Sequence, residues 1–219
     1  ESSYTFTPTA SSQSASDLNT LNGNATNISL ANVNTISSSS LSDLDTLATA
    51  IGNSQFTNAA GLTTIAVSDN PVDVTSLIAR IDSFDSISGG STTAMTLVSG
   101  ATLNVASSEI TEMLADETAG RLTIGDQLIT VTGAITVDNA NLLGATTTGK
   151  VTATIVNTET IAELSTLSAD GGINEFTIEI READATSATA GQLNAINDAV
   201  SSSTVIDLTN VTALAGSTL

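Results

Sequence analysis

Two short sequence patterns recur along this chain, and this repetition constrains its fold more than any other feature. Residues 16–21 (SDLNTL) return almost unchanged at residues 42–47 (SDLDTL), and residues 28–36 (ISLANVNTI) resemble residues 206–214 (IDLTNVTAL). Self-similarity of this kind is typical of repeat architectures, in which each unit buries its apolar face only against its neighbours. The sequence therefore predicts a series of similar units that pack on one another.

Each unit combines a helical pattern with a β pattern. Leu44 and Leu47 have the spacing of one helix face, whereas residues 175–181 alternate between apolar and polar side chains as a half-buried strand does. The spacing between units is irregular. We therefore predict an α/β or mainly β fold, namely a degenerate parallel solenoid of the β-helix-like kind with short helices on one side. The expected helix N-cap residues are Asp17, Asp43, Ser108, Thr158 and Thr189.

The chain is expected to form an N-terminal strand and linker over residues 1–15 and a single elongated repeat domain over residues 16–219. Because the sequence begins at Glu1 rather than at Met, we expect this domain to be a piece of a longer chain. Residues 121–132 place Gly125 and Asp126 between two apolar runs, which predicts a hairpin there.

The N-terminal strand carries two aromatic side chains that are candidate partner contacts. Tyr4 and Phe6 alternate with threonines before the Ser-rich linker. Such a strand either caps the repeat domain or pairs with the sheet edge of a neighbouring molecule, and disorder is the third alternative.

Charge excludes two classes of partner. The chain has 4 basic residues against 23 acidic ones, which gives a net charge of −19. Binding to phosphates needs clustered Lys and Arg, so nucleic acids and anionic membranes are poor partners. The sequence also lacks an apolar run of the roughly 18 residues that span a bilayer, so no membrane span is expected.

Composition also argues against catalysis. Histidine and cysteine are absent, which removes the commonest general base and the thiolate nucleophile. Two carboxylate pairs could in principle cleave glycosides, namely Glu109 with Glu112 and Glu175 with Glu179. Both pairs fit solvated faces of a helix and a strand better, so we do not expect an enzyme.

Calcium is the only cofactor for which the sequence offers a candidate site. Asp69, Asn70 and Asp73 form a compact group of oxygen donors around Pro71. Ca²⁺ takes about six to eight oxygen ligands from loops of this kind. The alternative is that these side chains are ordinary turn and cap residues.

Residues 183–217 carry a resemblance to a known kind of protein. The segments ADAT (183–186), GQLNAI (191–196) and VTALAGS (211–217) resemble repeats in very large secreted and cell-surface proteins of cyanobacteria. The resemblance covers most of residues 150–219 and, more loosely, residues 16–115. It implies roles in surface layers, motility and adhesion, and it brings no active site.

These observations together predict an extracellular or cell-surface structural protein that belongs to a filament, layer or adhesin. Its expected partners are copies of itself or other surface proteins. One alternative is a segment of a phage fibre or of a glycan-binding adhesin, and another is a secreted module stabilised by calcium.

Overall fold

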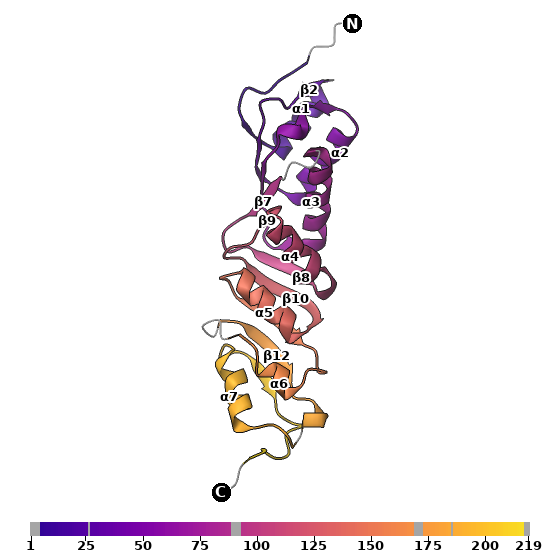
Figure 1. Cartoon of the computed structure of the whole chain (residues 1–219). Coiled ribbons are helices and arrows are strands. Elements are labelled where there is room, and N and C mark those ends of the chain that lie inside the picture. The colour runs from indigo at the N-terminus through magenta and orange to yellow at the C-terminus, as the bar shows by residue number, and fades with distance from the viewer. Residues whose placement is uncertain (1–4, 26, 89–92, 169–172, 185, 217–219) are drawn as a thin grey trace. The chain divides into compact units, whose positions relative to one another are not determined.

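The computed structural model describes residues 5–25, 27–88, 93–168, 173–184 and 186–216. These residues form seven α-helices, three short 3₁₀ helices and thirteen strands, and the strands lie in three mostly parallel sheets (Figure 1). The chain divides into two compact units, one of residues 1–101 and 111–124 and the other of residues 102–110 and 125–219. Each unit is described on its own below.

The first unit contains a five-stranded sheet in the order β1-β3-β5-β7-β9, together with a two-stranded sheet of β2 and β4. Its helices contact one another in sequence, α1 with α2 and α2 with α3 (Figure 1). The elements of this unit are β1 (Ser12–Ser14), α1 (Ala15–Asn24), β2 (Ile28–Ser29), β3 (Thr35–Ser39), α2 (Leu41–Gly52), β4 (Phe56–Thr57), η1 (Ala59–Gly61), β5 (Thr64–Val67), β6 (Val72–Asp73), α3 (Val74–Ser88), β7 (Ala94–Leu97), most of α4 (Ile110–Thr118) and β9 (Leu122–Thr123).

A line of paired, buried side chains crosses the larger sheet of the first unit. Ile36 pairs with Ile65, Ile65 with Met95 and Met95 with Leu122, all in parallel register. All four are at most 2% exposed. Leu44 and Leu47 of α2 are fully buried as well, so the helical spacing in the sequence correctly identified the packed face of α2.

In the second unit, β13, β12, β11, β10 and β8 lie side by side in that order, and each printed pair of neighbours is parallel. Helix α5 contacts β10 and β11, and α6 contacts α7. The elements of this unit are β8 (Thr102–Ala106), η2 (Ser107–Glu109), β10 (Leu128–Ile135), α5 (Val137–Thr146), β11 (Val151–Ile155), α6 (Ile161–Leu164), β12 (Glu175–Glu179), η3 (Glu182–Asp184), α7 (Ala190–Asp198) and β13 (Val205–Asp207).

The structure corrects the predicted fold class. The chain is α/β, with three open sheets, and the prediction of a β-helix-like solenoid is wrong. A solenoid of that kind needs sheets that continue through all of its units. Here one sheet runs from β1 to β9, whereas β8 and β10 to β13 belong to another sheet. Alternating helical and β patterns fit both arrangements, so the sequence alone did not separate them.

The predicted hairpin at residues 121–132 is also wrong. Strand β9 pairs in parallel with β7, whereas β10 pairs in parallel with β8 and β11. The Gly125–Asp126 turn therefore leads from one sheet into another instead of reversing the chain. The side chain of Gln127 folds back and accepts a hydrogen bond from the Gly125 N–H at 2.6 Å, which fixes this turn.

Candidate functional site

Two of the three predicted calcium ligands accept hydrogen bonds from the protein's own backbone. The Asp69 carboxylate accepts a hydrogen bond from the N–H of Leu41, the first residue of α2, at 2.8 Å. The Asp73 carboxylate accepts from the Ser76 N–H at 2.8 Å, where α3 begins. Asn70 lies between them on an exposed turn. Among the residues that the structure describes, no group of three or more Asp or Glu side chains could hold a metal ion.

One of the two predicted partner contacts lies at an edge within the first unit. Phe6 forms an isolated parallel bridge with Ile28. The Phe6 N–H donates to the Asn27 carbonyl at 2.9 Å, and the Phe6 carbonyl accepts from the Ser29 N–H at 2.8 Å. Its side chain is 49% exposed. Tyr4 lies outside the described residues.

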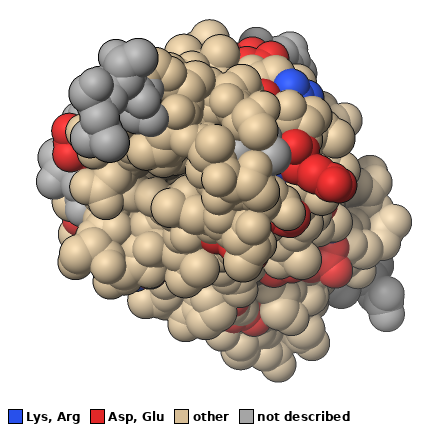
Figure 2. Space-filling view, turned by 90° about the horizontal axis from the view of Figure 1, so that it is seen from below, with Lys and Arg blue, Asp and Glu red and all other residues tan. Residues whose placement is uncertain are grey.

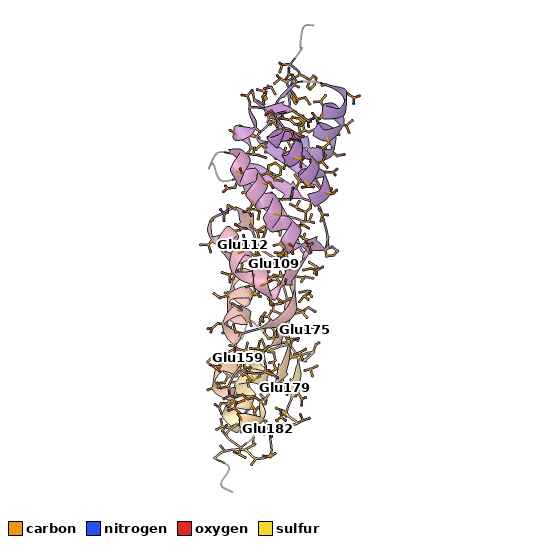
Figure 3. The ribbon with its side chains drawn as sticks, turned by 90° about the vertical axis from the view of Figure 1, so that its right-hand side faces the viewer. Glu109, Glu112, Glu159, Glu175, Glu179 and Glu182 are labelled. Carbon is orange, nitrogen blue, oxygen red and sulfur yellow. The ribbon has the colours of Figure 1, made fainter. Side chains whose placement is uncertain are left out.

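The structure places the two glutamate pairs in different settings. Glu175 and Glu179 are the first and last residues of β12, so four residues of extended chain, about 13 Å, separate them. Retaining and inverting glycosidases need carboxyl groups about 5 to 9.5 Å apart. Glu175 is bound by Lys150 at 2.8 Å, and Glu109 accepts from the Ala106 N–H at 3.2 Å. Figure 3 shows Glu159, Glu175, Glu179 and Glu182 at separate places on the second unit.

The most deeply buried carboxylate among the described residues is that of Asp116. It is 1% exposed, and Arg121 Nε donates to it at 2.9 Å. Burial raises the pKa of Asp116, the Arg121 guanidinium opposes this shift, and the negative charges of Asp82 and Asp85 add to it. Its second carboxylate oxygen, Oδ2, has no hydrogen-bond partner. Asp116 of α4 therefore holds Arg121, the residue just before β9, and fixes the turn between these two elements.

The described residues of both units line shallow clefts, among them the following two. A cleft of about 420 Å³ lies between α2 and α3, where Asp45 and Arg80 are held together as an ion pair. A cleft of about 260 Å³ lies over β10, β11 and β12. Its lining residues are Ala134, Thr154, Ile155, Val156, Asn157, Thr177 and Glu179. Neither lining includes an aromatic side chain.

A set of polar side chains that the sequence analysis missed connects successive segments of the chain. In each case the first residue of a helix donates its N–H to a side chain that lies 22 to 28 residues further on. Two of these acceptors, Ser39 and Glu159, directly precede the N-cap residue of the next helix. A recurring Ser or Glu immediately before an N-cap Ser or Thr is the sequence signal that could have identified them. The four donor and acceptor pairs are Ala15 with Ser39, Leu41 with Asp69, Val137 with Glu159, and Ile161 with Asp184.

Threonine hydroxyls make similar connections between neighbouring strands and turns. Thr63 donates to the Asn34 carbonyl at 3.2 Å, and Thr93 donates to the Leu62 carbonyl at 3.1 Å. In the second unit, Thr147 donates to the Gln127 carbonyl at 2.6 Å. These bonds satisfy backbone groups at the ends of the strands. Much of the polar composition of the chain is therefore used inside the fold.

The C-terminal strand is the least covered part of the second unit. Strand β13 is the last in its sheet, and no described residue between positions 201 and 216 is buried. Val205 is 60% exposed, Leu208 45% and Leu214 40%. Figure 2 views the molecule from the side where the C-terminus lies in Figure 1; uncharged residues cover most of this face, and acidic groups lie in separate spots.

Comparisons with protein-family models, with curated proteins and with solved structures find no match to this chain. Within the described residues, no helix has both the length and the apolar character required to cross a membrane.

Proposed function

We propose that this chain is an extracellular structural protein that belongs to a surface filament, layer or adhesin, and that it acts by associating with copies of itself or with other surface proteins. The uncovered C-terminal strand β13 is the observation that carries this proposal. Large apolar side chains that are exposed together at the end of a sheet mark a surface suited to association.

The chemistry of the described residues supports a structural role over an enzymatic one. The chain has no histidine or cysteine, and its buried carboxylates accept hydrogen bonds from the protein's own backbone and arginines. Catalysis needs a reactive group within reach of a substrate. In the cleft between α2 and α3 the cation, Arg80, is held by Asp45, and in the cleft over β10, β11 and β12 the carboxylate is that of Glu179.

A second candidate function is glycan binding at the cleft over β10, β11 and β12. Thr154, Asn157, Thr177 and Glu179 offer hydroxyl, amide and carboxylate groups that can hydrogen-bond sugar hydroxyls. The absence of an aromatic side chain from this lining makes the cleft a poorer sugar site than most, so we rank it second.

Electron microscopy of the purified chain separates the two candidates. A structural protein is expected to form ordered assemblies as its concentration rises. Dispersed single particles that bind a glycan array, and that lose this binding in a Thr177→Ala variant, would favour the glycan-binding role and count against the structural one.

A further inference from the structure

Three carboxylates share one guanidinium in the first unit. Arg121 lies in the turn before β9, and its Nη2 is 2.5 Å from Asp116 of α4 while its Nη1 is 3.6 Å from Asp85 of α3. The negative charge of Asp82, which is also on α3, acts on Asp116 as well. The neighbouring strands β7 and β9 carry no charged residue. Asp116 is therefore surrounded by one cation and two further carboxylates.

The two oxygens of the Asp116 carboxylate have different surroundings. Arg121 Nε donates to Oδ1 at 2.9 Å, and Nη2 lies 2.5 Å from the same oxygen. A guanidinium that binds a carboxylate side by side would use both oxygens. Here Oδ2 is buried without a hydrogen-bond partner among the described residues. Because an ionised carboxylate with one buried, unpartnered oxygen is costly, this geometry favours the neutral, protonated form.

A buried carboxylate of the second unit has the opposite surroundings. Asp184 Oδ2 accepts from the Ile161 N–H and from Arg181 Nε, and Oδ1 accepts from the Ser187 hydroxyl. Both oxygens therefore have donors, which favour the ionised form. In keeping with this contrast, burial raises the pKa of Asp116, whereas the Arg181 guanidinium lowers the pKa of Asp184.

Arg121 keeps its other partners when Asp116 becomes neutral. Its Nη1 is still beside the Asp85 carboxylate, and its backbone N–H donates to the Asp116 carbonyl at 2.9 Å. Neither interaction requires a charge on the Asp116 side chain. Protonation of Asp116 therefore leaves the turn between α4 and β9 in place.

We propose that Asp116 is a proton-binding site of the first unit, which takes up a proton at a higher pH than an exposed aspartate does and is stabilised by it. Asp184 of the second unit acts in the opposite sense, because a proton there would compete with its three donors. Acid therefore acts in opposite directions on the two units through these two side chains.

The sign of the effect follows from the linkage between protonation and folding. A carboxylate whose pKa is raised in the folded state costs stability at neutral pH. This cost decreases as the pH falls through the folded pKa and is gone below the unfolded pKa of about 3.9. The wild-type first unit should therefore gain stability, relative to a variant that lacks this carboxylate, as the pH falls.

The test compares Asp116→Asn, which keeps the shape of the side chain and removes its titration, with Glu112→Gln. Glu112 is exposed one turn earlier on the same helix and is the matched control. Native-state hydrogen exchange of the amides in β5 and β7 measures the stability of the first unit on its own, at several values from about pH 7 to about pH 4. NMR titration of the Asp116 carboxyl in the wild-type chain measures proton uptake directly.

As the pH falls, the β5 and β7 amides of the wild type are expected to gain protection relative to those of Asp116→Asn. A smaller change is expected relative to Glu112→Gln, and the Asp116 carboxyl is expected to titrate above about pH 3.9. A titration at or below that value would overturn the proposal, and so would a constant difference between the wild type and Asp116→Asn. Because the NMR titration uses the wild-type chain, it decides the question even if Asp116→Asn does not fold.

Discussion

At the scale of single residues, Asp184 shows how one side chain connects separate segments of the second unit. Its carboxylate accepts from the Ile161 N–H at 3.1 Å, from Arg181 Nε at 2.7 Å and from the Ser187 hydroxyl at 3.3 Å. It is 7% exposed. One side chain therefore joins the start of α6 to the turn that follows β12.

Replacing Asp184 with alanine is expected to destabilise the second unit by about 1–3 kcal/mol, because the buried Ile161 N–H loses its acceptor. Urea denaturation followed by circular dichroism measures this change. Glu182→Ala is the control, because Glu182 is an exposed neighbour in the same turn. Equal losses in the two variants would contradict the role assigned to Asp184.

The Asp184 carboxylate also makes the free energy of unfolding depend on pH. The Arg181 guanidinium, helped by the Ile161 N–H, holds the pKa of Asp184 below its ordinary value. A carboxylate whose pKa is lower in the folded state adds stability above its unfolded pKa of about 3.9, and this stability is lost as the pH falls through the folded pKa. The free energy of unfolding of Asp184→Asn should therefore fall less steeply below about pH 4 than that of the wild type. Parallel pH profiles would show that Asp184 is not responsible.

At the scale of elements, polar residues just before the short helices determine where each helix begins. The N-caps of α1 and α2 are Ser14 and Ser40, and each hydroxyl accepts from the N–H three residues later at 3.0 Å. Helices of about ten residues are marginal by themselves in water. The N-cap side chains and the hydrogen bonds to the next segment therefore largely determine where these helices begin.

Replacing Ser40 with alanine is expected to lower the free energy of unfolding by about 1 kcal/mol, because the Asp43 N–H loses its cap. Ser42→Ala is the matched control, since Ser42 is exposed within α2 and alanine has the higher helix propensity. Chemical denaturation of the two variants and the wild type provides the comparison. A loss for Ser42→Ala as large as that for Ser40→Ala would contradict the assignment of the cap.

The positions of these elements could be predicted from the sequence more easily than their partners. Thr189 is the N-cap of α7 as predicted, and residues 175–179 form a strand with Phe176 and Ile178 buried. The predicted caps Asp17 and Asp43 are instead the third residues of their helices, because the serine three positions earlier takes the cap.

Sheet membership could not be predicted, because a half-buried parallel strand has the same alternation in either sheet. The Gly125–Asp126 turn illustrates this, since a turn dipeptide between two apolar runs also suits a passage between sheets. The hydrogen-bond partners of the helix starts were harder to predict than sheet membership. The side chains that accept from Leu41 and Ile161 lie 28 and 23 residues away, and no local pattern encodes such a pairing.

At the scale of the whole molecule, the net charge of −19 opposes association of copies. The exposed side chains of Val205, Leu208 and Leu214 are uncharged, so salt should weaken the general repulsion without weakening a contact that they make. We expect self-association to strengthen as ionic strength rises from about 0.01 M to about 1 M, over which the Debye length falls from about 30 to 3 Å. Sedimentation equilibrium at several salt concentrations measures this, and weaker association at high salt would point to a contact made by ion pairs.

Removal of metal ions provides a further prediction at this scale. Because Asp69 and Asp73 are engaged by the N–H groups of Leu41 and Ser76, we expect a chelator to leave the melting temperature unchanged and added calcium not to raise it. Differential scanning calorimetry with chelator and with excess calcium tests this. A substantial fall in melting temperature with the chelator would favour the alternative of a calcium-stabilised module.

The central claim is that this chain is structural and acts by self-association. Sedimentation velocity of the wild-type chain over a wide range of concentrations tests this claim most directly. We predict that the weight-average mass rises steadily beyond that of a dimer as concentration increases. A single species with the mass of one chain, 21.9 kDa, at every concentration would contradict it.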